Sequence, residues 1–388
     1  MQSLLMNNKL ISLLLALFAL GLFVACRKTE DIEQIKKEAL AQYADLVLAS
    51  YDDSYNTATA LKQAIDAFLA APSEAGFQAC KQAWLAARIP YGQTEAYRFY
   101  AGPIDDADGP EGLLNAWPMD EAFVDYVDGN DAAGLINNPA AQPIISKEVL
   151  IGLNELFSEE SIFTGYHAVE FLLWGQDLST SGPGTRPYTD YVQGAGGTAE
   201  NQGRRGQYLQ VAADLILEHL AQVRDEWKNN GAYRQEFLNN KSNGEALGLI
   251  FSGLKEFSKG ELSGERMFVA IDTKDQENEH SCFSDNTITD LKMNLLGIKN
   301  VYFGVYTKSD GTTVSGTSFS DVAEKLDRAK ADAARAALED AEAKMNAIPA
   351  PFDQTIVNNS AAVTPAIDAL RLLSDRLADV GLAIGAEF

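Results

Sequence analysis

The stretch from Thr164 to Asp177, TGYHAVEFLLWGQD, places a histidine and a carboxylate three positions apart within an otherwise apolar segment. His167 is one of only three histidines among 388 residues, and Glu170 follows it. On a helix, residues three positions apart share one face, so the imidazole and the carboxylate can point at one site. Burying a carboxylate is costly unless it is paired or bound to a metal. The pair is therefore a candidate metal site, and a hydrogen-bonded core pair is the alternative.

Two further stretches concentrate polar side chains that could join such a site. Residues 87–106 read ARIPYGQTEAYRFYAGPIDD, and residues 264–286 read GERMFVAIDTKDQENEHSCFSDN. Loops held on a rigid scaffold are common places for binding residues. We expect additional ligands, or partners that orient the ligands, among eight of these side chains: Glu95, Arg98, Asp105, Arg266, Glu279, His280, Ser281 and Asp285.

The charge of the chain excludes one class of partner. The formal net charge is -24 and the pI is about 4.5. A phosphate backbone needs a basic face, so we expect no nucleic acid as a partner. One imidazole among several carboxylates is an oxygen-rich donor set, which suits iron or manganese better than a thiolate-preferring metal. Iron is the favoured cofactor on this basis, and zinc remains possible.

The N-terminus indicates export. Residues 11–25 read ISLLLALFALGLFVA, and Lys9 is the only charged residue before them. Such a run is short for a membrane-spanning helix and fits the apolar region of a secretory signal. Cys26 follows a small residue, which resembles the lipobox of bacterial lipoproteins. We predict a lipoprotein signal peptide over residues 1–25, lipidation at Cys26 and a polar tether over residues 26–33. An ordinary signal peptide with an incidental cysteine is the alternative.

The remaining sequence has the pattern of an all-α protein. Few stretches alternate with period two, and the length fits two helical-bundle lobes packed side by side, at residues 34–240 and 241–388. Whether Cys80 and Cys282 form a disulfide stays open at this point. Apolar residues at spacings of three and four predict helices over residues 31–71, 73–89, 207–229, 245–258, 285–304 and 319–347, with a last helix starting at Thr364 and Pro365.

The segment GYHAVE, residues 165–170, matches the GxHxxE motif of the imelysin-like family. The segments ARIPYGQTEAYRF, GPID, NAWP and EHSCFSDN resemble the other blocks of that family in the same order, across residues 34–385. The resemblance implies an exported, often lipid-anchored bacterial protein with two helical halves and a site at their junction. It implies His167 and Glu170 as metal ligands, with Gly165 allowing close backbone approach. The family is catalogued among metallopeptidases and is also tied to bacterial iron uptake.

The residues help to weigh these two functions. A common zinc peptidase carries HExxH, which this chain lacks, and no clear general base or oxyanion donor stands out. His219 lies on an amphipathic helix, so we expect it to be structural, and His280 can reach the site only through the fold. We therefore predict a metal-binding protein of iron acquisition in the bacterial cell envelope, lipid-anchored to a membrane and facing the periplasm or the surface. Iron-transport components are its expected partners.

Two alternatives remain open. The first is a metallopeptidase of the imelysin type, with catalytic residues that the sequence does not identify. The second is a binding protein for an organic ligand held in the cleft between the two lobes.

Overall fold

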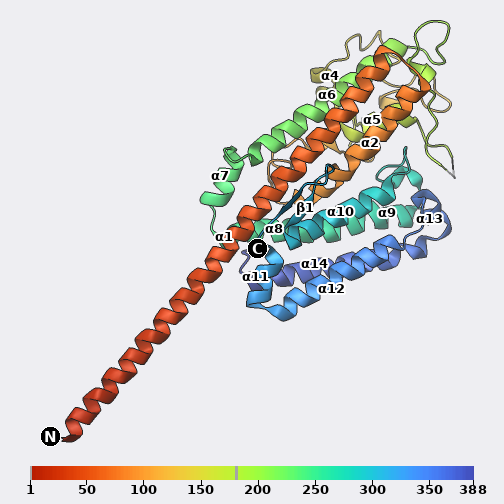
Figure 1. Cartoon of the computed structure of the whole chain (residues 1–388). Coiled ribbons are helices and arrows are strands. Elements are labelled where there is room, and N and C mark those ends of the chain that lie inside the picture. Colours follow the sequence, from red (N-terminus) through yellow and green to blue (C-terminus); the bar gives the residue numbers. More distant parts are fainter. Residues whose placement is uncertain (1, 180–181) are drawn as a thin grey trace.

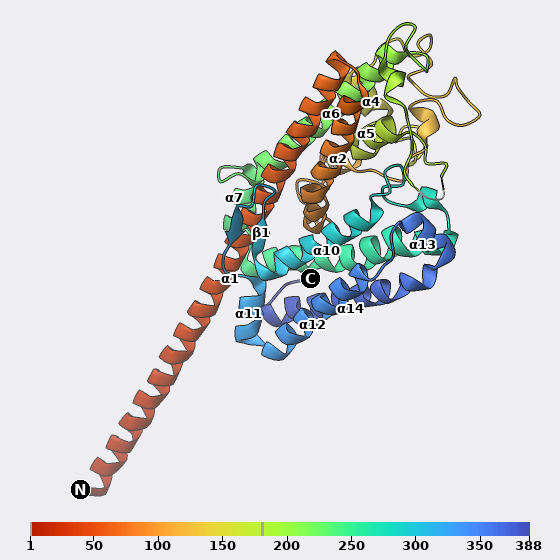
Figure 2. The ribbon, with the colours of Figure 1, turned by 45° about the vertical axis from the view of Figure 1, so that its right-hand side comes forward.

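The computed structural model describes residues 2–179 and 182–388, and nearly all of its elements are helices (Figure 1). The all-α class predicted from the sequence is therefore confirmed. The longest helix, α1, runs from Gln2 to Ala70, and Figures 1 and 2 show its N-terminal part projecting from the body. Met1 and the side chain of Cys26 lie outside what the structure describes, so the signal peptide and the lipid anchor stay predictions. No helix in the described part of the chain is long and apolar enough to cross a membrane.

A first helical group forms around α1, which packs along α2 and α6, while α5 packs against both α2 and α6. The start of α2 is fixed as predicted, because the Ser73 hydroxyl accepts a 3.2 Å hydrogen bond from the Gly76 amide. The helical elements of this part of the chain are α2 (Glu74–Thr94), η1 (Glu95–Tyr97), α3 (Glu111–Leu114), η2 (Glu121–Phe123), α4 (Lys147–Leu153), α5 (Gly165–Trp174), η3 (Tyr188–Tyr191) and α6 (Gln202–Trp227).

A second helical group follows in the chain. In this group α12 packs along α14, and α14 packs along α8 and the π-helix η4. The helical elements here are α7 (Ala232–Asn239), α8 (Asn243–Glu256), η4 (Phe257–Phe268), α9 (Val269–Thr273), η5 (Gln276–Asn278), α10 (Thr287–Phe303), α11 (Phe319–Leu326), α12 (Arg328–Asn346), α13 (Phe352–Asn358), η6 (Ser360–Ala362) and α14 (Thr364–Ile384).

The two groups meet where α10 packs against α2. One continuous hydrophobic core includes residues of both groups, and the Tyr43 ring of α1 lies 6.2 Å from the Phe319 ring of α11. The predicted division into lobes at residue 240 stays a prediction, because a shared core sets no boundary by itself. Helix α2 packs against both α5 and α10, which brings buried residues of all three helices into this interior.

Several local predictions were wrong. Helix α2 continues past the buried Pro90 to Thr94, although proline usually ends a helix. The region 319–347 holds two helices, because the Asp327 side chain accepts a hydrogen bond from the Lys330 amide and starts α12. The last helix starts at Thr364 as predicted, but we also expected Thr364 to be its N-cap, and Val363 takes that position.

A two-stranded hairpin was also missed. Strands β1 (Val305–Thr307) and β2 (Thr313–Ser315) pair in antiparallel register, with Tyr306 opposite Val314. Three-residue strands are too short to give a readable alternation in the sequence.

Candidate functional site

Helix α5 brings His167 and Glu170 into the interior, with exposed fractions of 2% and 0%. The helix can start there only because Gly165 is a glycine. Its φ is +83°, and a Cβ atom at this position would lie 2.5 Å from the Leu114 carbonyl oxygen. A side chain would therefore be strained and would push α3 away. The close backbone approach expected at Gly165 is real, and it joins α5 to α3.

The two side chains of the motif contact each other directly. His167 Nδ1 lies 2.9 Å from Glu170 Oε2, while Glu170 Oε1 accepts hydrogen bonds from the Ser284 amide at 3.0 Å and the Ser284 hydroxyl at 2.6 Å. Among the described residues, His167 Nε2 has no hydrogen-bond partner. A carboxylate on the far nitrogen of a histidine is the arrangement that orients metal-binding imidazoles. The geometry thus leaves Nε2 as the atom available to a ligand.

The fold adds a second histidine beside the first. The His280 ring lies 4.9 Å from the His167 ring at an interplanar angle of 77°. His280 Nδ1 lies 2.9 Å from Asp290 Oδ2, and its Nε2 lies 3.3 Å from the side-chain amide of Asn115. Because the Asn115 amide donates, we assign the imidazole proton of His280 to Nδ1. The two histidines therefore share one pattern, in which a carboxylate holds Nδ1.

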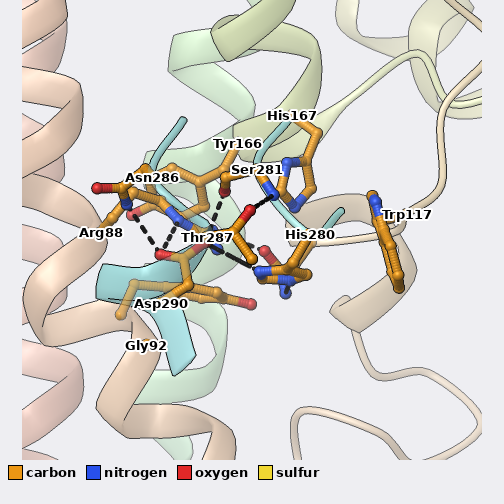
Figure 3. A network of polar contacts seen from close by, with 12 residues as sticks. Arg88, Gly92, Trp117, Tyr166, His167, His280, Ser281, Asn286, Thr287 and Asp290 are labelled. Atoms are coloured by element: carbon orange, nitrogen blue, oxygen red, sulfur yellow. Dashed lines mark hydrogen bonds and ion pairs between the residues drawn. The ribbon is translucent and has the colours of Figure 1, made fainter. Parts of the chain in front are cut away.

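Asp290 is the centre of the polar network drawn in Figure 3. Arg88 donates to both of its oxygens, at 2.8 and 3.3 Å, and donates to Asn115 Oδ1 at 2.7 Å. The Ser281 hydroxyl donates to Asp290 Oδ2 at 2.6 Å, and the side-chain amide of Asn286 donates to Asp290 Oδ1 at 3.0 Å. Every lone pair of this buried carboxylate is therefore engaged, as a stable buried charge requires.

Sequence reasoning missed three residues of this network. Arg88 lies in the first polar stretch but was not among the predicted site residues, and Asn115 lies in the NAWP segment. Asp290 sits on α10 among ordinary helical residues. Its position after His280 has no metal-site spacing, so only the fold could reveal it.

Burial controls the ionisation of the pair His167 and Glu170. It lowers the pKa of His167 well below its usual value and raises the pKa of Glu170 to about 8. Burial also lowers the pKa of His280 to about 3. It would raise the pKa of Asp290, but Arg88 and His280 outweigh it and hold that pKa well below the usual range. Both imidazoles are thus neutral at physiological pH, which is the form that binds metals.

The predicted residues Glu95, Arg98 and Arg266 form a second buried network next to the first. Arg266 Nη2 lies 2.5 Å and Arg98 Nη1 lies 2.9 Å from Glu95 Oε2, and Arg266 also donates to Asn294 at 2.8 Å. Burial would raise the pKa of Glu95, but the two arginines outweigh it and lower that pKa to about 2. These arginines therefore balance buried carboxylates.

The other predicted residues have different surroundings. Asp105 holds a turn, because its carboxylate accepts hydrogen bonds from the Phe99 and Gly102 amides. The Glu279 carbonyl accepts a hydrogen bond from Trp117 Nε1. Asp285 is partly buried, and its backbone φ is +57°. The structure therefore brings His280 and Ser281 to the motif, and it places Asp105 in a structural turn.

The described residues contain neither a preformed metal site nor a disulfide. Within residues 2–179 and 182–388, no group of three or more His, Cys, Asp or Glu side chains is arranged to hold a metal ion directly. Cys80 and Cys282 are both buried free thiols. A metal at the motif would thus bind His167 Nε2, and neighbouring side chains would have to move to supply further ligands.

Comparison with known proteins places the chain in a family. The family model described as Imelysin matches residues 47–377, and the chain belongs to the imelysin family. Iron-regulated protein A from Synechococcus elongatus is 26% identical over 374 residues, which cover 92% of this chain and 88% of that protein.

Two solved structures share the fold. A putative iron-regulated protein A precursor from Parabacteroides distasonis has a TM-score of 0.70 at 20% identity, over 91% of this chain and 95% of that one. An imelysin-like protein from Psychrobacter arcticum has a TM-score of 0.61 at 16% identity, over 92% and 97% of the two chains.

Proposed function

We propose that this protein binds a metal ion, with iron favoured and zinc possible, at His167 and that it acts in bacterial iron acquisition. One observation carries the proposal: in the described structure, the buried Nε2 of His167 has no partner while Nδ1 contacts Glu170. A buried polar atom left without a bond costs about 1–3 kcal/mol. A metal–nitrogen bond would remove this cost, and the Glu170 contact already fixes the ring for it.

His280 is the second nitrogen ligand that we propose. Its neutral ring lies against His167, and its Nε2 contacts only a side-chain amide, which is a weak competitor for a metal. Glu170 and Asp290 then act as the two carboxylates that orient the rings. Iron binds readily to such mixtures of imidazole and carboxylate.

The proposed setting is the bacterial cell envelope. The matching names "iron-regulated protein A" support an iron-related role, and one of them describes a precursor. Together with the apolar N-terminus, the word precursor supports an exported protein. We further propose that this protein is anchored through Cys26 and passes iron to transport components.

We place peptidase activity second. Glu170 Oε1 accepts from Ser284 and Glu170 Oε2 contacts His167, while both oxygens of Asp290 accept from neighbouring groups, so neither side chain has an oxygen free to act as a general base. An organic ligand between the helical groups would first have to reach side chains whose exposed fractions are 2% or less.

The proposal is tested by titrating the purified full chain with ferrous and ferric iron and with zinc, beside His167→Ala and His280→Ala. We expect both variants to lose most of the affinity of the wild type. His219→Ala is the matched control, because His219 is also buried, on α6, and should leave affinity unchanged. Wild-type affinity in His167→Ala would overturn the proposal. Cleavage of an unfolded substrate by the wild-type protein would instead support peptidase activity.

A further inference from the structure

Arg186 is a buried arginine that uses only one of its three guanidinium nitrogens. Its side chain is 1% exposed and lies between two aromatic rings, with Cζ 4.8 Å from the Tyr126 ring centre and 5.1 Å from the Phe171 ring centre. Nη1 donates to Asp125 Oδ2 at 2.7 Å and to Asp190 Oδ2 at 3.4 Å. Among the described residues, Nε and Nη2 have no hydrogen-bond partner.

Arg205 is a buried arginine of the same network with all three nitrogens bonded. Its Nε and Nη2 donate to the two oxygens of Asp125 at 2.6 and 2.8 Å, and its Nη1 donates to the carbonyls of Asp190 and Glu200. Two arginines and two aspartates balance in charge, so Arg186 needs no further anion to neutralise it. What it lacks is acceptors for its Nε–Nη2 edge, and buried donors without acceptors cost free energy.

The Nε–Nη2 edge of an arginine is a planar fork that binds a carboxylate through two parallel hydrogen bonds. Arg186 lines a cavity of about 270 Å³ between the end of α5 and the segment that follows η2. Gly175 lines the same cavity, and a Cβ atom on it would lie 3.6 Å from Arg186 Nε. Because Gly175 has no side chain, the space beside Nε is left open on this side.

The cavity offers two further kinds of contact. Asp128 and Asp131 are exposed carboxylates of its lining, and among the described residues Arg186 is the one cationic side chain there. Trp174 and Leu178 add apolar surface, and Leu178 is 69% exposed. The lining thus combines a donor fork, acidic groups and an apolar surface that a ligand could cover.

We propose that this cavity binds an α-amino acid with an apolar side chain. The carboxylate of the ligand accepts hydrogen bonds from Nε and Nη2 of Arg186. Its ammonium group faces Asp128 and Asp131, as a charge-assisted contact requires. Its side chain covers Leu178, which removes apolar surface from water. A ligand without net charge is favoured, because the buried ion pairs around the arginine are already balanced and the lining is acidic. The site needs neither histidine of the proposed iron site.

The test is calorimetric titration of the purified full chain with L-phenylalanine and with L-leucine. Wild type should bind at least one of them with a Kd of about 1 mM or below. For the tighter ligand, the amine without the carboxylate and the acid without the ammonium group should each bind at least about tenfold more weakly. Arg186→Lys keeps the positive charge and removes the fork, so it should weaken amino-acid binding at least about tenfold.

Arg205→Lys is the matched control. Arg205 pairs with the same Asp125, but it is absent from the described lining of the cavity, so this variant should bind the amino acid as wild type does. Thermal unfolding checks the folding of both variants, and Arg205→Lys should be the less stable one, because Arg205 makes more hydrogen bonds than Arg186.

The double variant Asp128→Asn, Asp131→Asn changes only exposed side chains, so it keeps the test valid if Arg186→Lys does not fold. It should weaken amino-acid binding about tenfold, since the ammonium group loses both charged partners. Three results would each overturn the proposal: no binding of either amino acid by wild type at millimolar concentration, wild-type affinity in folded Arg186→Lys, or wild-type affinity in the double variant. His167→Ala should retain amino-acid binding, so this proposal and the iron site fail independently.

Discussion

His167 and His280 lie against each other in the interior, with ring centres 4.9 Å apart and ring planes at 77°. Each ring is held at Nδ1 by a carboxylate 2.9 Å away, Glu170 for the first and Asp290 for the second. The two halves of the pair come from α5 and from the segment before α10. The motif in α5 thus provides one half of a paired arrangement, and the following helices complete it.

Glu170→Gln should lower the affinity for iron about 10- to 100-fold, since losing the carboxylate that orients a metal-binding histidine has effects of this size. Calorimetric titration measures the change. Glu170→Ala should in addition destabilise the fold by about 1–3 kcal/mol, because it leaves Ser284 and His167 Nδ1 without their partner. Unchanged affinity in Glu170→Gln would mean that Glu170 does not act through His167.

Asp290→Asn should destabilise the protein by about 3–5 kcal/mol, because it leaves the buried Arg88 guanidinium without its charged partner. Urea unfolding at pH 7 measures this loss. Asp340→Asn is the comparison, since Asp340 pairs with Lys344 at the surface and should change stability by less than about 1 kcal/mol. Similar losses in both variants would show that the network is not what stabilises the interior.

Glu95 should make the fold sensitive to acid. Its pKa is lowered from 4.5 to about 2 in the folded protein. Its contribution to the free energy of unfolding is present above pH 4.5 and is lost as the pH falls from about 4.5 toward about 2. Glu95→Gln should therefore flatten the stability profile between pH 5 and about 3, measured by urea unfolding. A profile as steep as that of wild type would assign the acid sensitivity to other carboxylates.

Glu279 should act in the opposite direction. Burial raises the pKa of Glu279 in the folded protein to about 9. The contribution of Glu279 to the free energy of unfolding is therefore fully present below about pH 4.5 and is lost as the pH rises through about 9. At pH 8, Glu279→Gln should be more stable than wild type by at least about 1 kcal/mol, and at pH 4 the two should agree. If wild type and Glu279→Gln are equally stable at both pH values, the Glu279 carboxyl lies in a solvated environment.

Gly165→Ala should destabilise the protein by about 1–3 kcal/mol, because the position has a φ of +83° and faces the Leu114 carbonyl. It should also weaken iron binding, since α5 would shift. Gly152→Ala provides the matched control: it lies in α4 with nothing within 4 Å of the added Cβ, and alanine there should stabilise by about 0.5–1 kcal/mol. Thermal unfolding and titration of both variants give the comparison.

The sequence by itself determined what depends on local pattern. The helix starting after Ser73, the long amphipathic α6 and the position of His167 and Glu170 on one helical face all follow from spacings of three and four or from a capping side chain. These features need only neighbours along the chain, which is why periodicity and capping rules find them. The all-α class follows for the same reason.

Only the tertiary structure decided which side chains share the interior. Asp290 and Asn115 complete the histidine pair, yet neither of them carries a local signal. The buried Pro90 likewise stays inside α2 although its local preference is to end a helix. These relationships arise from contacts between residues far apart in sequence, where packing and charge compensation in a low-dielectric interior outweigh local preference.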